Sequence, residues 1–253
     1  MAIIVFIIAG LLAGAGVGLV GLSAATIITP ILVAVLKMSA YKAIGIALIS
    51  DVLAASISSF TYFKHKNINI KNGIIMMIST LIFTYLFSFL AKDIPNNVLG
   101  GAAIFSSGIL GFKFLFKPVK SKEELAKKEM SKKKQFIMTI IWGAFIGIIC
   151  GTIGAGGGLM ILLVLTSVLS YDLKTAIGTS VFIMAFTALT GGIAHISQSG
   201  TDIPALIICS VSALISSTFL SRIANKIDNT LLNKIVGVFL IVFAVVLTVI
   251  RFF

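Results

Sequence analysis

Charged side chains are scarce in this sequence: they make up 11% of its 253 residues, whereas hydrophobic residues make up 58%. The mean hydropathy is +1.15. A water-soluble domain of this length could reach that value only with a very large exposed apolar surface. The composition therefore excludes a soluble globular fold and predicts an all-α polytopic membrane protein.

Cysteine and histidine are also rare, with two residues of each. Cys150 and Cys209 lie within apolar segments, where small hydrophobic packing is expected and a disulfide has no obvious purpose. His65 and His195 lie near the ends of apolar segments, and the four residues form no metal motif. A membrane-embedded enzyme would need a nucleophile with a base, or a metal. We therefore expect no catalytic residue, no cofactor and no bound metal.

Acidic residues are fewer than basic ones, 8 against 20, which gives a formal net charge of +12. Many of the basic residues gather in one connection: Lys113, Lys117, Lys120, Lys122, Lys127, Lys128, Lys132, Lys133 and Lys134. In a membrane protein such a cluster reports orientation, because cytoplasmic loops are enriched in Lys and Arg. We expect a cytoplasmic loop in contact with the lipid bilayer, and no nucleic-acid partner.

At least eight stretches are uncharged or nearly so. They are residues 1–36, 43–63, 73–91, 97–112, 135–169, 175–200, 203–220 and 230–250. As continuous helices the first and fifth would be roughly 50 Å long, against a hydrocarbon core of about 30 Å. Each must therefore fold back or break, which predicts about 8 to 10 membrane segments in total. The first stretch has no basic n-region and is too long for a signal-peptide core, so we expect it in the mature protein.

A constant offset relates the two halves of the chain. Gly18 and Gly151 are 133 positions apart (151 − 18). The same offset pairs Gly14 with Gly147, Gly21 with Gly154, Ala43-Ile44-Gly45 with Ala176-Ile177-Gly178, and Asn96 with Asn229. We predict a first transmembrane repeat at 1–116, a basic loop at 117–134 and a second repeat at 135–253. Each repeat would contain a glycine-broken helical hairpin and three transmembrane helices. Secondary transporters are commonly built in this way, with the substrate site at the repeat interface.

Loop charges favour inverted repeats. The turn with Lys64, Lys66 and Lys71 should be cytoplasmic, whereas its counterpart at residues 198–202 has no basic residue and should be outside. Lys37, Lys42 and Lys92 run against this assignment.

Four glycines occupy five positions at 154–158, within residues 135–169, which carry no charge. A helix that starts inside the bilayer presents free backbone N–H groups and a partial positive charge, which bind an anion without an ionised side chain. Close helix packing is the alternative role for the glycines, but each glycine disfavours a helix by about 1 kcal/mol. The predicted substrate-binding residues are Gly18, Gly21, Ser23, Thr26, Gly154, Gly156, Gly157, Gly158, Thr179 and Ser180. The hydroxyls of Thr179 and Ser180 can line a cavity or bond back to their own helix.

Asp51 is the acidic residue expected inside a membrane span. A carboxylate there is costly unless it faces a cavity, is protonated or finds a partner, so Asp51 is the candidate for proton coupling. The alternative is a structural contact with Ser50, Ser56 and neighbouring helices. At the repeat offset Asp51 corresponds to Met184, so no second acid supports the relay.

These motifs resemble those of the TauE/SafE family of sulfite exporter-like membrane permeases. The resemblance rests on GTIGAGGGLMILLVL (151–165) and LKTAIGTSVFIMAFTALTGGIAHISQSGTDI (173–203), with degenerate copies GVGLVGLSAATIITPILVAVL (16–36) and YKAIGIALISDV (41–52). It covers nearly the whole chain apart from the basic loop. In the first half, Leu22, Ser23, Ala24 and Ala25 stand where the family tends to carry a fuller glycine cluster.

The resemblance implies transport of sulfur-containing anions, such as sulfite, sulfonates or sulfoacetate, across a prokaryotic plasma membrane, coupled to protons or another ion. Two alternatives stay open. The first is a structural or assembly subunit, although such a role gives no reason for duplicated helix breaks. The second is a transporter or channel for another ion, although backbone N–H groups favour anions over cations.

Overall fold

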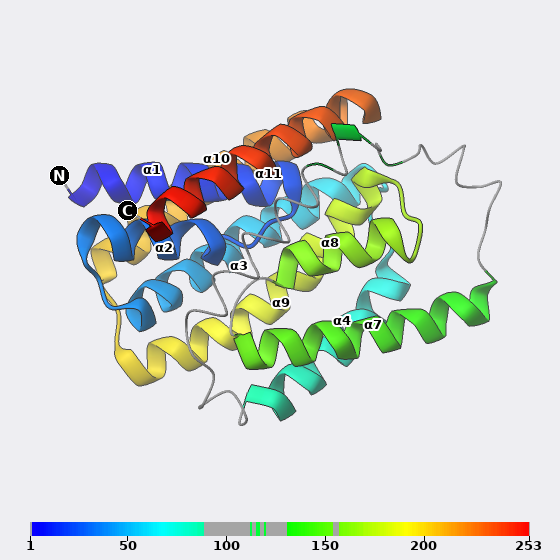
Figure 1. Ribbon diagram of the computed structural model, residues 1–253, viewed down its shortest axis with the longest axis horizontal. Coiled ribbons are helices and arrows are strands. Elements are labelled where there is room, and N and C mark those ends of the chain that lie inside the picture. The colour runs from blue at the N-terminus through cyan, green and yellow to red at the C-terminus, as the bar shows by residue number, and fades with distance from the viewer. Residues whose placement is uncertain are drawn as a thin grey trace.

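The computed structural model describes residues 2–88, 112, 115–116, 119, 131–153 and 157–252. The elements in these ranges are helices (Figure 1), which confirms the predicted all-α class. In chain order they are α1 (Ala2–Ala15), the π-helix η1 (Gly16–Val20), α2 (Ala25–Leu36), α3 (Ala40–Lys64), α4 (Ile70–Ser88), α7 (Lys132–Ile153), α8 (Gly157–Ser167), α9 (Leu173–Ser199), α10 (Ile203–Lys226) and α11 (Asn229–Phe252).

Within the described ranges, seven helical stretches are long and apolar enough to cross a membrane. They start at Ala2, Lys42, Ile70, Lys132, Leu173, Ile203 and Asn229. The helices α2 and α8, with 12 and 11 residues, are shorter. They reach only about 18 Å and about 17 Å, so neither crosses a hydrocarbon core of about 30 Å alone. The apolar segment expected at 97–112 lies almost wholly outside the described residues.

Both long apolar segments are interrupted rather than continuous. In the first, η1 ends at Val20, and Gly21 adopts a left-handed backbone conformation (φ 73°) that favours glycine. The chain then reverses, and α2 begins at Ala25. In the second segment, α7 ends at Ile153 and α8 begins at Gly157, while Gly154 and Gly156 lie outside the described residues. The two short helices begin near the middle of the molecule and extend toward opposite ends (Figure 1).

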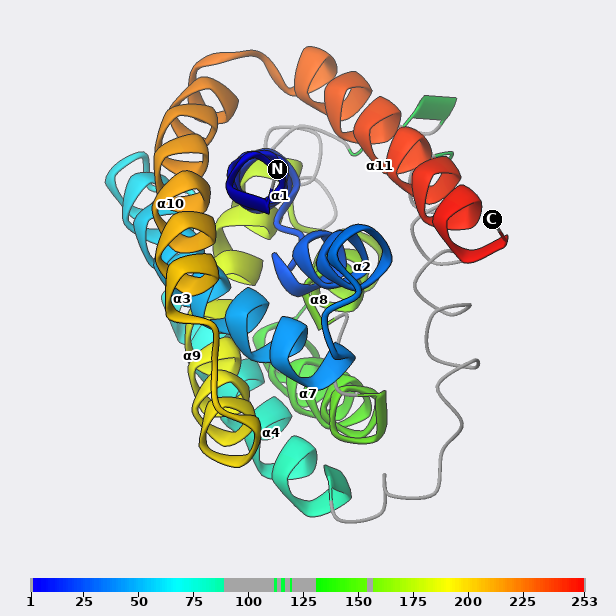
Figure 2. The same cartoon turned by 90° about the vertical axis from the view of Figure 1, so that its left-hand side faces the viewer.

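The helices form two layers. Viewed along the bundle, α10, α3, α9 and α4 form one layer, and α1, α2, α8 and α7 lie beside it (Figure 2). α3 packs along α9, α4 along α7, and α1 along α10. α3 and α9, which correspond at the repeat offset, run in opposite directions (Figure 1). The two breaks therefore lie in one layer and face the α3–α9 pair in the other.

Glycines let α1 and α7 approach their partner helices closely, and the contacts recur at the repeat offset. Gly10 and Gly14 of α1 contact Cys209, Ser212, Ala213 and Ser216 of α10, whereas Gly143 and Gly147 of α7 contact Met76, Ser79, Thr80 and Phe83 of α4. Each contacted residue of α4 lies 133 positions before its equivalent in α10. A Cβ atom at any of the four glycines would lie 3.0 Å or less from a backbone oxygen. These four glycines therefore permit close helix packing, which is the alternative role for glycine.

Candidate functional site

The breaks of the two halves meet at Gly158. This glycine is buried in the first turn of α8, and a Cβ atom on it would lie 2.7 Å from the carbonyl oxygen of Gly21 and 3.0 Å from the backbone nitrogen of Ser23. Ser180 of α9 also contacts Gly21, because its Oγ atom would overlap a Cβ atom on that glycine. The structure thus brings together Gly21, Ser23, Gly158 and Ser180, which the sequence places far apart.

Ser23 organises the start of α2. Its Oγ atom accepts a hydrogen bond from the backbone N–H of Ala25 at 3.3 Å. Its carbonyl oxygen accepts from the backbone N–H of Thr26 at 3.1 Å and from the Thr26 hydroxyl at 2.6 Å. The Thr26 side chain is therefore engaged within its own turn, as polar side chains at helix starts often are.

Asp51 of α3 is bound to this same serine. The Ser23 hydroxyl donates a hydrogen bond of 2.6 Å to Asp51 Oδ2. Asp51 is 1% exposed, and its Oδ1 atom has no hydrogen-bond partner in the part of the chain that the structure describes. A buried carboxylate oxygen without a donor is energetically costly. Asp51 is therefore a buried acid that a proton or another positive charge would stabilise.

The serines considered from the sequence are not partners of Asp51. Ser50 donates to the carbonyl of Ile46 at 2.8 Å and lies 3.0 Å from the hydroxyl of Ser210. Ser56 is exposed on the surface of α3. The contact with Ser23 was missed because it depends on which side of the break faces α3, and no local pattern encodes that.

Few charges surround Asp51. The elements packed on α3 are α1, η1, α2, α9 and α10. The first three carry no charged residue, and the charged residues of α9 and α10, namely Lys174, Arg222 and Lys226, lie near helix ends. His195 lies near the C-terminal end of α9.

In the middle of α10, the thiol of Cys209 lies 3.5 Å from the carbonyl of Phe6.

The two halves differ at the site. Met184, the counterpart of Asp51, lies against the first turn of α8, because its sulfur would overlap a Cβ atom on Gly158. The thioether neither carries charge nor donates a hydrogen bond. Only the α2 side of the site therefore has a carboxylate at this position.

Gly157 and Gly18 have different surroundings. Among the described residues, a Cβ atom on Gly157 would meet one group within 4 Å, the sulfur of Cys150 at 3.0 Å. Gly18 lies inside η1, packs on Ser217 and Ser221 of α10, and accepts a hydrogen bond of 3.0 Å from the Tyr62 hydroxyl. Gly157 thus has few neighbours in the part of the chain that the structure describes, whereas Gly18 supports the break from behind.

Thr179 and Ser180 are both fully buried and hydrogen-bonded. Thr179 Oγ1 accepts from the backbone N–H of Asn69 at 3.1 Å, which fixes the start of α4. Ser180 Oγ donates to the carbonyl of Ile177 at 2.8 Å, which is back-bonding to its own helix. These side chains hold α9 against the α3–α4 turn and against Gly21.

A polar cluster absent from the sequence-based site links the two halves beyond the C-terminal end of α8. Asn72 Nδ2 donates to the Tyr171 hydroxyl at 2.6 Å, and Gln135 Nε2 donates to the same oxygen at 3.3 Å. Burial raises the pKa of the Tyr171 phenol, so it stays protonated at neutral pH. The asparagines at 67, 69 and 72, crowded into a short turn between apolar helices, were the available signal.

Within the described ranges, no three His, Cys, Asp or Glu side chains lie together in an arrangement that could hold a metal ion. Cys150 and Cys209 are free thiols. The chemistry available at the meeting point of the breaks is therefore backbone N–H groups, serine hydroxyls and one carboxylate.

Comparison with known proteins gives the family. Residues 6–247 match the family described as "Sulfite exporter TauE/SafE". The chain is 24% identical over 195 residues to the probable membrane transporter protein YdhB of Bacillus subtilis, with 76% of this chain and 78% of YdhB covered.

Two further relatives carry the same description. The probable membrane transporter protein YunE of Bacillus subtilis is 23% identical over 214 residues, with 77% of this chain and 78% of YunE covered. The probable membrane transporter protein MJ0441 of Methanocaldococcus jannaschii is 25% identical over 202 residues, with 76% and 72% covered. No solved structure matches the chain. The family match spans nearly the whole sequence. The chain therefore belongs to the sulfite exporter TauE/SafE family and is a multi-pass membrane transporter rather than an enzyme.

Proposed function

We propose that this protein is a secondary transporter that moves small sulfur-containing anions, such as sulfite or a sulfonate, across the plasma membrane of a prokaryote. The observation that carries the proposal is the contact of Gly158 with Gly21 and Ser23, where two short helices begin at one buried place. The positive ends of both helix dipoles then act on the same region, and the first-turn N–H groups of α8 supply donors there, which favours a negative charge. The family description supports the sulfur-containing substrate.

The open space beside Gly157 is the proposed position of the anion. There it would reach the first-turn N–H groups of α8, with Gly21, Ser23 and Gly158 as the adjoining wall; Gly154 and Gly156 stay substrate residues predicted from the sequence. Among the described residues, a Cβ atom on Gly157 would meet the Cys150 sulfur at 3.0 Å and no helix backbone, so a larger side chain there would enter this volume. Gly18, Thr26, Thr179 and Ser180 position the wall through the bonds described above.

Asp51 is the proposed proton-coupling residue. Ser23 connects it to the anion site, because this hydroxyl donates to Asp51 and also accepts from the start of α2. A charged carboxylate next to a bound anion is repulsive in a low dielectric, and protonation of Asp51 removes the repulsion. Proton and anion would therefore bind together and cross together.

The proposed architecture is a pair of inverted repeats, residues 1–116 and 135–253, joined by a cytoplasmic basic loop at 117–134. The opposite directions of α3 and α9 and the exchanged glycine contacts support it. In such transporters the two halves rock around a site near the midplane, and the two short helices of this fold begin near the middle of the molecule (Figure 1).

A flux assay on proteoliposomes tests the proposal. Purified protein is assayed with sulfite, thiosulfate, a short alkyl sulfonate and chloride, next to the variants Gly157→Val and Gly45→Ala. Gly45 serves as the control because a Cβ atom there would lie 3.3 Å from the Ile196 side chain of α9 and would meet no residue of either break. We expect sulfur-anion flux in wild type and Gly45→Ala and none in Gly157→Val. Flux of chloride alone, or undiminished sulfite flux in Gly157→Val, would contradict the proposal.

A further inference from the structure

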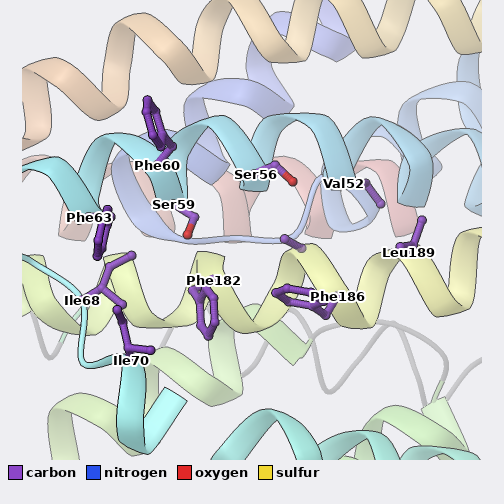
Figure 3. Close-up of a pocket in the computed structure, with 11 residues that line it drawn as sticks. Val52, Ser56, Ser59, Phe60, Phe63, Ile68, Ile70, Phe182, Phe186 and Leu189 are labelled. Atoms are coloured by element: carbon purple, nitrogen blue, oxygen red, sulfur yellow. The ribbon is translucent and has the colours of Figure 1, made fainter. Parts of the chain in front are cut away.

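A groove of about 430 Å³ lies between α3 and α9, apart from the anion site (Figure 3). Its lining consists of Val52, Ser56, Ser59, Phe60, Phe63, Ile68, Ile70, Phe182, Ala185, Phe186 and Leu189. None of these residues belongs to the proposed substrate or proton sites. The groove therefore needs an explanation of its own.

Small side chains create the hollow and aromatic ones form its walls. Ser56, Ser59 and Ala185 leave space, whereas Phe60 and Phe186 are large and remain 53% and 45% exposed. In Figure 3 the labelled serines come from α3, and the rings of Phe182 and Phe186 come from α9. On a membrane-spanning helix pair, an open apolar groove of this kind faces lipid acyl chains.

The length of the groove matches one leaflet. Along α3 it extends from Val52 to Phe63, a distance of 11 residues (63 − 52). At the rise of an α-helix this is about 17 Å, close to half of a hydrocarbon core of about 30 Å. A single acyl chain of one leaflet fits this span.

The end of the groove is basic. Lys64 follows Phe63 and places its ammonium 4.5 Å from the centre of the Phe60 ring, which forms part of the wall. Lys71 follows Ile70, which lines the same end, and both lysines are exposed. These ammonium groups lie where the phosphate of a lipid in the groove would be. Lysines at a membrane surface attract anionic headgroups, which are concentrated in the cytoplasmic leaflet.

We infer that the groove binds one acyl chain of an anionic phospholipid of the cytoplasmic leaflet, with its phosphate held by Lys64 and Lys71. The lipid lies along α3 and α9, the helices that carry Asp51 and Ser180. It would occupy the side of this pair that faces the bilayer.

Lipid retention tests the inference. The full chain is reconstituted in nanodiscs of phosphatidylcholine and phosphatidylglycerol in equal parts, extracted in mild detergent, and analysed by native mass spectrometry for bound lipid. Val52→Trp fills the groove, and Val242→Trp is the control, because Val242 is 55% exposed on α11. Lys64→Gln with Lys71→Gln removes the basic end, and Lys37→Gln with Lys42→Gln is its control, because these lysines are exposed at the end of α2 and the start of α3.

We expect wild type and both controls to retain phosphatidylglycerol. Val52→Trp should lose it, and the Lys64 and Lys71 pair should lower the preference over phosphatidylcholine by about tenfold. Equal retention of the two lipids by wild type would overturn the inference, as would unchanged retention in Val52→Trp. A dimer in detergent that Val52→Trp converts to a monomer would show that a second copy fills the groove, and would also overturn it.

Discussion

At the scale of single residues, the fold buries one carboxylic acid, Asp51, beside the helix break, where its protonation can be coupled to transport. Asp51 is almost completely buried, accepts a hydrogen bond from the Ser23 hydroxyl and interacts with the backbone N–H of Ala24, while its Oδ1 atom has no donor among the described residues. Such a group is stable when neutral and strained when charged. Ser23 is shared with the start of α2, so a change in charge on Asp51 alters the hydrogen bonding at the break.

The first prediction concerns Asp51→Asn. The amide keeps an acceptor for the Ser23 hydroxyl but cannot gain or lose a proton. Flux of a short alkyl sulfonate, which stays fully ionised over this range, should rise in wild-type proteoliposomes as the side from which the anion enters is acidified, because protonated Asp51 no longer repels the anion. Flux through Asp51→Asn should be independent of pH over the same range. Flux measured against pH checks this.

Ser50→Ala is the control for that experiment, because Ser50 bonds to Ile46 and Ser210 and not to the carboxylate. It should keep the wild-type pH profile. A profile of Asp51→Asn that matches wild type would remove Asp51 from the coupling mechanism.

The depth of Asp51 could be predicted from the sequence, because one acid inside an uncharged apolar stretch is visible at once. Its partner could not. Ser23 lies 28 positions away, and the pairing depends on how the residues after η1 pack against α3. The same holds for Tyr171, whose hydrogen bonds join segments 99 and 36 positions apart.

At the scale of elements, glycine serves two purposes that sequence alone separates only in part. The clustering at 154–158 and at Gly21 predicted breaks, and α8 does begin within the first of these clusters, at Gly157. The spaced glycines of α1 and α7 instead permit close helix contacts. The distinction rests on the partner helix: a Cβ atom at Gly14 or Gly147 would strike a backbone oxygen of α10 or α4.

The second prediction compares two glycines at equivalent repeat positions, Gly178 on α9 and Gly45 on α3. A Cβ atom on Gly178 would overlap the carbonyl oxygen of Asn67, which is backbone and cannot yield easily. A Cβ atom on Gly45 would lie 3.3 Å from the flexible Ile196 side chain. Gly178→Ala should therefore lower the free energy of unfolding by about 1 to 3 kcal/mol, and Gly45→Ala should change it little.

Thermal unfolding of both variants in the same detergent measures the difference. Equal melting temperatures for the two variants would mean that α9 and the α3–α4 turn are not packed as closely as described.

At the scale of the whole molecule, each half contributes one short helix to the centre, and helix partners are exchanged between halves. α1 of the first half packs on α10 of the second, and α7 of the second packs on α4 of the first. The repeat offset was evident from the sequence, whereas this exchange of partners was not, because a sequence match between halves does not say which copy each helix contacts.

The third prediction concerns orientation. Ile70 and Ile203 are the first residues of α4 and α10, stand at equivalent repeat positions, and are 43% and 62% exposed. In a background in which Cys150 and Cys209 are replaced by alanine, Ile203→Cys should react with a membrane-impermeant maleimide in intact cells. Ile70→Cys should react only after lysis. Labelling of both from the same side would contradict inverted repeats.

The most direct test of the central claim is equilibrium binding of radioactive sulfite to the purified protein. We predict saturable binding at one site in wild type and in Gly45→Ala, and its loss in Gly157→Val with the melting temperature unchanged. Wild-type sulfite affinity in a well-folded Gly157→Val protein would contradict the claim that the anion is held where the two broken helices meet.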